Sequence, residues 1–220
     1  TLPNVDDLKN RASQFVTTRI LDRNGNLLYE VLDPNEGRRT FITLDKISPS
    51  LIAATIATED KSFYTNPGFD PIAILRALWQ NLRGGETIAG GSTITQQVAR
   101  NFYLSNEYSY LRKFKEMLLA LKMEKELSKD EILGLYLNKI FFGNRAYGIA
   151  AASLVYFDKS VNELTIPEVA YLAALPKAPN NYHPFRQRER AIERRNWVID
   201  RMAEAGFIKS ADADKAKHTP

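Results

Sequence analysis

At residues 48–63 the chain reads SPSLIAATIATEDKSF, and the spacing of its apolar residues governs how the surrounding chain is expected to fold. Ile52, Ile56, Glu59 and Phe63 recur every three or four residues, which places their side chains on one face of a helix. Three of these four side chains are apolar. The pattern therefore predicts a buried helix face with one acidic side chain, Glu59, among apolar neighbours.

A carboxyl group in such surroundings loses its hydration. Because desolvation disfavours the charged form, we predict that the pKa of Glu59 is raised. A carboxylate with a raised pKa is suited to accept a proton near neutral pH, which is the task of a general base. The alternative is a slightly rotated helix with Glu59 in solvent beside Asp60, as is usual for a glutamate.

The composition narrows the possible chemistry. With 220 residues, 44% of them hydrophobic, the chain is long enough for one domain or two closely packed lobes. The absence of cysteine removes disulfides, thiolate nucleophiles and cysteine-ligated metals. His183 and His218 are the only histidines, too few for a multi-histidine zinc site, and they make a Ser-His-Asp triad improbable. Catalysis is therefore expected to rest on carboxylates and cations.

The formal net charge is +4, which favours an anionic partner such as a phosphate, a nucleic acid or an acidic membrane surface, although ordinary solubility also explains it. No uncharged stretch reaches the roughly 18 residues that a membrane-spanning helix needs, and residues 146–157 form the longest candidate. No signal peptide is visible. Since the chain begins with Thr1, we expect it to be a piece excised from a longer protein.

The predicted elements divide the chain into three parts. Residues 1–47 form an N-terminal segment in which the β-rich runs 17–22 and 27–31 flank Asn24-Gly25, a dipeptide typical of a β-hairpin turn; a short extended piece is predicted at 41–44. Residues 48–206 are predicted to be helical almost throughout. Residues 207–220 form a polar tail that we expect to fray and to mark a truncation point.

Helix boundaries follow from capping residues. The Asp-Pro pair at 70–71 predicts the start of a second helix, because aspartate caps and proline fits the first helical position. Ser128 and Thr165 each precede a glutamate by three residues, which is the spacing of a capping box. A last long helix is predicted over 186–205, because Gly206 suits a helix C-terminus.

A second candidate site lies at the helix start 91–93, Gly-Ser-Thr. Unpaired backbone N–H groups and the positive end of the helix dipole favour an anion there, although many capped helices bind nothing. Thr93, Gln96, Gln97 and Arg100 share one face of this helix. Because such a polar stripe adds little to helix stability, we interpret it as a surface that contacts phosphate or sugar.

A third candidate is the run Arg112-Lys113-Phe114-Lys115-Glu116, in which the carboxylate follows Lys113 by three residues and lies on the same side of the helix. A solvated charge pair is the ordinary explanation. Lysine before glutamate is, however, the less favourable order for the helix dipole, so the run fits a phosphate site better. The aromatic and aliphatic runs 102–104 and 108–111 are expected to lie in the core or to form an apolar patch against a membrane or lipid chain.

Taken together, the strings EDKSF at 59–63, GSTITQQ at 91–97 and RKFKE at 112–116 resemble the signature motifs of the peptidoglycan glycosyltransferases, glycosyltransferase family 51. This domain is found in class A penicillin-binding proteins and monofunctional transglycosylases. The resemblance agrees in order and spacing and covers about residues 17–206. Three positions depart from the family pattern: Asn66 replaces histidine, Arg100 replaces lysine and Gly134 replaces glutamate.

The resemblance implies a mainly α, lysozyme-like domain with two lobes, one of them a membrane-facing jaw, and a small N-terminal β-hairpin. It implies that lipid II is polymerised into β-1,4 glycan strands, with inversion at the donor anomeric carbon and release of undecaprenyl pyrophosphate. Glu59 is the implied base for the acceptor 4-hydroxyl, and Glu116 is the implied second catalytic carboxylate. The implied substrate-binding residues are Asp60, Ser92, Thr93, Gln96, Gln97, Arg100, Asn101, Arg112 and Lys113.

The resemblance also implies partners and a location. The chain would act on lipid II and the growing glycan strand at the external, periplasmic face of the bacterial cytoplasmic membrane, with its anchor absent from this chain and no nucleic acid involved. Phe102, Tyr103 and Leu104 would contact the membrane surface or a lipid chain, and the full-length chain would carry a transpeptidase domain. A divalent cation, Mg or Mn, could lie at Glu116 beside the donor pyrophosphate.

Two other functions are weighed against this one. Peptidoglycan cleavage by a muramidase or lytic transglycosylase also uses a buried glutamate, but it has no use for a phosphate site. A non-catalytic basic helical module could bind anionic lipid or nucleic acid through residues 112–115, but this leaves Glu59 unexplained.

Overall fold

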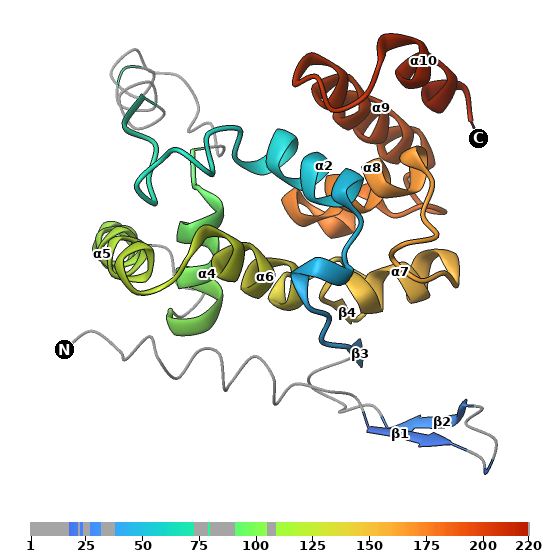
Figure 1. Cartoon of the computed structure of the whole chain (residues 1–220), viewed down its shortest axis with the longest axis horizontal. Helices are drawn as coiled ribbons and strands as arrows, with labels where there is room; N and C mark the ends of the chain where they lie inside the picture. The colour runs from blue at the N-terminus through green and yellow to red at the C-terminus, as the bar shows by residue number, and fades with distance from the viewer. Residues whose placement is uncertain are drawn as a thin grey trace.

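The computed structural model describes residues 18–21, 23, 27–31, 38–72, 79, 91–104 and 109–219, and within them the chain is mainly helical (Figure 1). The α-helices are α2 (Pro49–Glu59), α4 (Ile94–Tyr103), α5 (Tyr110–Glu126), α6 (Lys129–Lys139), α7 (Ile149–Phe157), α8 (Ile166–Ala174), α9 (Arg188–Glu204) and α10 (Ser210–His218). Short 3-10 turns are η1 (Leu44–Lys46), η2 (Leu175–Lys177) and η3 (Pro179–Tyr182). The rest of the helix predicted after residues 70–71 lies mostly outside the described residues.

Four short strands accompany the helices. Strand β1 (Thr18–Leu21) pairs antiparallel with β2 (Leu27–Val31), whereas Asn24-Gly25 of the predicted tight turn lies outside the described residues. Strand β3 (Arg38–Arg39) pairs parallel with β4 (Ala146–Tyr147).

The extended piece predicted at 41–44 is not a strand, because a side chain replaces the partner strand there. Asn138 of α6 accepts a hydrogen bond from the backbone N–H of Ile42 and donates one to its carbonyl oxygen, both at 2.8 Å. These two bonds satisfy the backbone of Ile42 without a sheet. The chain then enters η1, so the prediction of an extended run over the whole of 41–44 was wrong.

The two predicted capping boxes are confirmed. Ser128 at the start of α6 and Thr165 at the start of α8 each exchange hydrogen bonds with the glutamate three residues later. Helix α9 ends close to the predicted position, and Gly206 follows it with φ +76°, a left-handed conformation that favours glycine.

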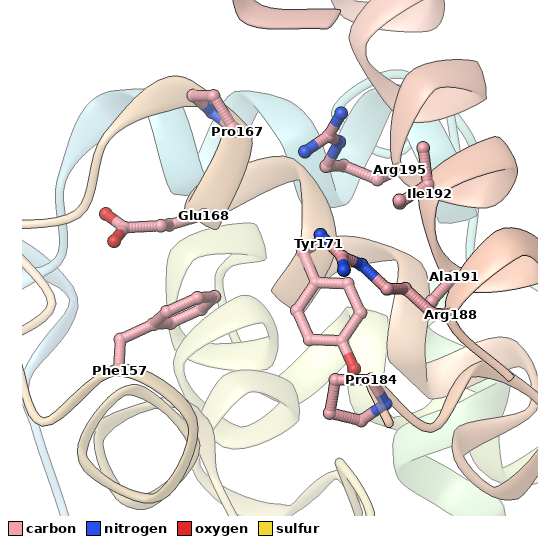
Figure 2. A pocket seen from close by; sticks show the side chains of 9 residues that line it. All are labelled: Phe157, Pro167, Glu168, Tyr171, Pro184, Arg188, Ala191, Ile192 and Arg195. Carbon is pink, nitrogen blue, oxygen red and sulfur yellow. The ribbon is translucent and has the colours of Figure 1, made fainter. Parts of the chain in front are cut away.

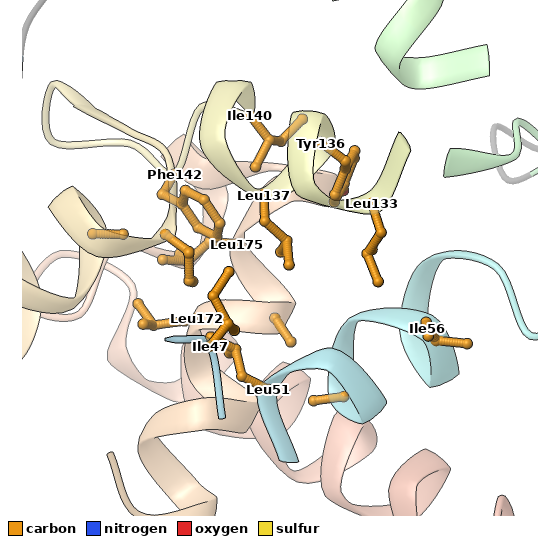
Figure 3. Close-up of a cluster of buried hydrophobic side chains, with 14 of the residues drawn as sticks. Ile47, Leu51, Ile56, Leu133, Tyr136, Leu137, Ile140, Phe142, Leu172 and Leu175 are labelled. Carbon is orange, nitrogen blue, oxygen red and sulfur yellow. The ribbon is translucent and has the colours of Figure 1, made fainter. Parts of the chain in front are cut away.

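The core lies where α2 packs between two helix groups (Figure 1). Helices α8 and α9 contact α2 and each other, while α4 contacts α5 and α6. Figure 3 shows Leu133 and Leu137 of α6 facing the apolar side chains Leu51 and Ile56 of α2. Because both groups of helices share this core, the C-terminal end of α2, which carries Glu59, is held between them.

The tail is more ordered than its composition predicted. Residues 210–218 form α10, whose Ala213 and Ala216 are buried against the rest of the domain. The guanidinium of Arg195, itself buried in α9, donates to the carbonyl oxygens of Thr219 at 2.8 Å and Lys217 at 3.1 Å. The expectation that this tail frays was therefore wrong. No helix among the described residues is long and apolar enough to cross a membrane.

Candidate active site

Glu59 is the last residue of α2 and lines a hollow of about 500 Å³ together with Asp60, Ser92 and Thr93. Its Oε2 accepts a hydrogen bond of 2.9 Å from Nε2 of Gln97 on α4. The first and second candidate sites of the sequence, which are more than 30 residues apart in the chain, thus meet at one hollow.

Burial raises the pKa of Glu59 above its ordinary value of 4.5, as the sequence predicted. The hydrogen bond from Gln97 acts in the opposite direction, and so do the positive charges of Arg194, Lys177 and Arg100. Desolvation is the largest of these effects. The site therefore contains a carboxylate that takes up a proton more readily than an ordinary glutamate and faces an open hollow.

Asp60 has a different environment from its neighbour, because hydrogen bonds saturate its carboxylate. Its oxygens accept from Nδ2 of Asn66 at 2.9 and 3.1 Å and from the backbone N–H of Ile94 at 3.1 Å. Lys129 in turn donates to the carbonyl oxygen of Asn66 at 2.7 Å and to Glu124 at 2.7 Å. The predicted substrate contact of Asp60 stays a prediction, while the structure gives it an anchoring role beside Glu59.

The start of α4 forms a third capping box. Thr93 accepts from the backbone N–H of Gln96 at 3.2 Å, and Oε1 of Gln96 accepts from the backbone N–H of Thr93 at 3.0 Å. The hydroxyl of Thr93 also donates to the carbonyl oxygen of Gly68 at 2.6 Å. These bonds give Thr93 and Gln96 structural tasks in fixing the helix start, in addition to their predicted contact with substrate.

The third candidate site joins the same hollow through Ser92. Nζ of Lys113 donates to Oγ of Ser92 at 2.6 Å and to Oε1 of Glu116 at 2.5 Å. The Glu116 side chain is fully buried, whereas the Lys113 side chain is 42% exposed. Lys113 therefore links the buried carboxylate of Glu116 to Ser92, which lines the hollow that contains Glu59.

The remaining predicted residues lie on or near α4 and α5. Arg100 is half-buried and its charge acts on Glu59, while Asn101 is exposed and Arg112 is half-buried. Phe102, Tyr103 and Leu104, the predicted membrane contacts, are half-buried and pack against the core. On α5, Leu111 and Phe114 are instead 63% and 54% exposed beside the basic residues.

Glu116 is the residue for which a divalent cation was predicted, although Glu59 and Asp60 also carry carboxylates. Its Oε2 is buried and has no hydrogen-bond partner among the described residues. No group of three or more His, Cys, Asp or Glu side chains that could hold a metal occurs in the described part of the chain. A magnesium ion at this single oxygen would have to be held mainly by substrate phosphates, which is a usual arrangement for this ion, and its presence here stays a prediction.

Four residues of the site were missed in the sequence. The charges of Arg194 and Lys177 lower the pKa of Glu59, and Trp197 and Arg201 line the hollow. All but Lys177 come from α9, far along the chain. The sequence pattern that could have indicated the α9 residues is the three- or four-residue spacing of Arg190, Arg194, Trp197 and Arg201. This spacing places the four side chains on one face of α9.

A mainly helical fold with one desolvated glutamate in an open hollow is typical of enzymes that act on glycans through a carboxyl group. The particular family follows from sequence: the family model described as Transglycosylase matches residues 24–203, and this chain belongs to that family. The resemblance to the peptidoglycan glycosyltransferases drawn from the motifs is confirmed.

The chain is also similar to longer proteins. It is 46% identical over 216 residues to penicillin-binding protein 1A of Escherichia coli, covering 98% of this chain and 25% of that protein. It is 49% identical over 183 residues to penicillin-binding protein 1A of Aquifex aeolicus, covering 83% and 25%. The crystal structure of penicillin-binding protein 1A from Haemophilus influenzae matches with a TM-score of 0.53 and 30% identity, over 93% of this chain and 21% of that one. The chain thus spans about a quarter of the length of these curated relatives.

Proposed function

We propose that this chain is a peptidoglycan glycosyltransferase domain that polymerises lipid II into β-1,4 glycan strands. The observation that carries the proposal is the shared hollow: the desolvated carboxylate of Glu59 and the hydroxyl of Ser92, which Lys113 contacts, line the same space. A glycosyl transfer from a diphosphate needs a proton acceptor and fixed positive charge within one cleft.

In this mechanism Glu59 removes the proton of the acceptor's 4-hydroxyl as that oxygen forms a bond to the donor's anomeric carbon. The bond between the anomeric carbon and the diphosphate breaks, and the electron pair leaves with undecaprenyl pyrophosphate, so the configuration inverts from α to β. Gln97 holds the carboxylate in place through its 2.9 Å hydrogen bond. No general acid is required, because the diphosphate departs as an anion.

Negative charge grows on the leaving diphosphate in the transition state. Lys113, Arg112, Arg100 and the helix start at Ser92 are the groups that we propose to stabilise it. The ion pair with the buried carboxylate of Glu116 holds Lys113 in a fixed direction before the substrate arrives, which lowers the cost of orienting the charge during the reaction. A divalent cation at Oε2 of Glu116 would add positive charge at the diphosphate, and this cation remains a proposal.

The finer features of the fold and its setting belong to the same proposal. We propose a two-lobed, lysozyme-like arrangement around the hollow, a membrane-facing side and action at the periplasmic face of the cytoplasmic membrane. The exposed apolar side chains Leu111 and Phe114, next to the cations of α5, support such a membrane-facing side. The relatives' greater length supports a further domain in the full-length protein, for which we propose a transpeptidase.

Cleavage of glycan strands is the competing function, since a raised pKa also suits a general acid. Incubating the protein with lipid II and, separately, with finished glycan strands distinguishes the two. We expect polymer from lipid II, and no cut strands. Glu59→Gln should abolish polymer formation, whereas Glu189→Gln, an exposed glutamate at the start of α9, should not. Cut strands without polymer would establish the competing function, and binding of lipid II without conversion would leave a lipid-binding module.

A further inference from the structure

One face of α9 carries a stripe of four side chains that the proposed chemistry does not use. Arg190, Arg194, Trp197 and Arg201 follow one another at intervals of four, three and four residues. Arg190 and Arg201 are eleven residues apart, and a rise of about 1.5 Å per residue gives the stripe a length of about 16 Å. The buried residues of α9 lie on another face of the helix. Within the stripe Arg190 and Trp197 are exposed, Arg194 is half-buried, and Arg201 is half-buried and paired with Glu204.

Trp197 connects this stripe to the candidate active site. It lines the hollow that contains Glu59, and it also lines a second hollow of about 440 Å³. The other residues of this second hollow, which we call the α9 hollow, are Asn181, Tyr182, Arg190, Glu193 and Arg194. A substrate group bound in the α9 hollow would therefore lie beside the hollow that contains Glu59, because Trp197 lines both.

The guanidinium of Arg194 is held in an orientation that suits anion binding. Its Cζ lies 3.8 Å from the centre of the Trp197 ring, so the ring fixes the plane of the guanidinium. Stacking leaves the in-plane N–H donors available, and the buried Nε–H has no acceptor among the described residues. Such a planar fork matches the two oxygens of a carboxylate.

The charges of the α9 hollow favour a singly charged ligand. Arg190 and Arg194 supply two positive charges and Glu193 supplies one negative charge, which leaves one positive charge to neutralise. A carboxylate fits this balance better than a diphosphate, which carries more than one negative charge. The amide of Asn181 and the phenol of Tyr182 can pair with neighbouring peptide groups.

We propose that the α9 hollow binds a carboxylate of the substrate's peptide branch, with Arg190 and Arg194 as its partners. The site would hold the peptide-bearing sugar next to Glu59 and would give the enzyme a preference for acidic peptide branches. This inference rests on the proposed function, because lipid II supplies the peptide branch.

The test compares Arg190→Ala with Arg188→Ala. Both arginines are exposed on α9, but Arg188 lies beside Tyr171 and Pro184 in a separate hollow between α8 and α9 (Figure 2). Initial rates are measured with lipid II and with lipid II whose peptide carboxylates are amidated. We expect Arg190→Ala to raise KM for lipid II about tenfold, with kcat little changed. The amidated substrate should show no difference between the wild type and either variant.

A binding measurement separates failure of this inference from failure of the proposed function. A soluble disaccharide-peptide without lipid or diphosphate is titrated by calorimetry into the wild type and both variants. Weaker binding to Arg190→Ala alone supports the site, even for a protein that makes no polymer. Equal binding by all three proteins, or displacement of the fragment by inorganic pyrophosphate, overturns the carboxylate site. Normal polymerisation by Arg190→Ala with unchanged KM also overturns it and leaves the proposed function standing.

Discussion

Glu59 and Glu116 are both removed from bulk water, but their surroundings differ. Glu59 has one neutral donor, Gln97, and burial raises its pKa. Glu116 has a direct ion pair with Lys113 at 2.5 Å. A carboxylate without a close cation is ready to take up a proton, whereas a carboxylate paired with a lysine is suited to hold positive charge in place. Glu59 is thus suited to be the base, and Glu116 is suited to position the cation of Lys113.

The largest expected effect is that of Glu59→Gln. Removing a general base should lower the polymerisation rate by about 10³-fold, while lipid II binding stays nearly intact. The same substitution should increase the free energy of unfolding at neutral pH, because an amide avoids the cost of burying a charge. Rates are measured with lipid II, and stability by urea unfolding. Appreciable turnover by this variant would contradict the role of Glu59 as the base.

The pH dependence of the free energy of unfolding gives a second test of Glu59→Gln. Because burial raises the pKa of Glu59, the folded state binds a proton that the unfolded state has already lost over the interval between the two pKa values. The wild type therefore loses stability as pH rises through this interval and regains it as pH falls. The stability advantage of Glu59→Gln should shrink on acidification. An advantage that does not change with pH would contradict the desolvated carboxylate.

The second prediction concerns the anchoring of the Glu59 region. Lys129 contacts Asn66 and Glu124 and lies 4.8 Å from the centre of the Phe63 ring. Lys129→Met should lower the free energy of unfolding by about 3 kcal/mol, because the Asn66 carbonyl oxygen loses its donor and the Glu124 carboxylate loses its cation. The matched control Lys159→Met breaks a more exposed ion pair with Glu168, also at 2.7 Å, and should cost about 1 kcal/mol or less. Equal losses in urea unfolding would show that Lys129 is not an anchor.

The third prediction concerns the ion pair between Glu116 and Lys113. Glu116→Gln should reduce kcat/KM with lipid II about 10²-fold, because Lys113 loses the charge that fixes its direction. Glu126→Gln is the control on the same helix, since Glu126 forms a longer, more exposed pair with Lys122 at 3.8 Å. Steady-state kinetics should show little change for the control. Equal kinetics for the two variants would remove Glu116 from the site.

The smallest expected effect is that of Gln97→Leu. The hydrogen bond from Gln97 lowers the pKa of Glu59, so its loss should raise that pKa further. The acid limb of the pH–rate profile should then move to higher pH, with a loss of about tenfold or less at the optimum. Glu189→Gln, an exposed change outside the site, should leave the limb in place. A limb that moves to lower pH would contradict the assigned bond.

Local signals predicted much of the fold and of the Glu59 site. The capping boxes at Ser128 and Thr165 depend only on residues three apart, and the burial of Glu59 was predicted from the apolar residues spaced around it. Both depend on near neighbours in the chain. Their prediction did not require knowledge of how the helices pack. The predicted helix was too long, because α2 ends at Glu59 and Phe63, although buried, lies in the turn that follows.

Contacts between distant segments could not be predicted in this way. The position of Arg194 near Glu59 depends on how α9 packs against α2, and the bond between Asn66 and Lys129 joins two segments whose sequences carry no sign of each other. The only apolar residues of α10 are Ala211, Ala213 and Ala216, of which the last two are buried, so its polar composition did not indicate an ordered helix.

The most direct test of the account is a titration of the Glu59 carboxyl group by carbon-13 NMR, with the resonance assigned by its absence in Glu59→Gln. We predict a titration midpoint above the ordinary glutamate value of 4.5. The polymerisation rate should fall on the acid side of its pH profile at the same pH. A midpoint at or below 4.5, or a rate that does not follow this titration, would contradict the claim that Glu59 is the desolvated base.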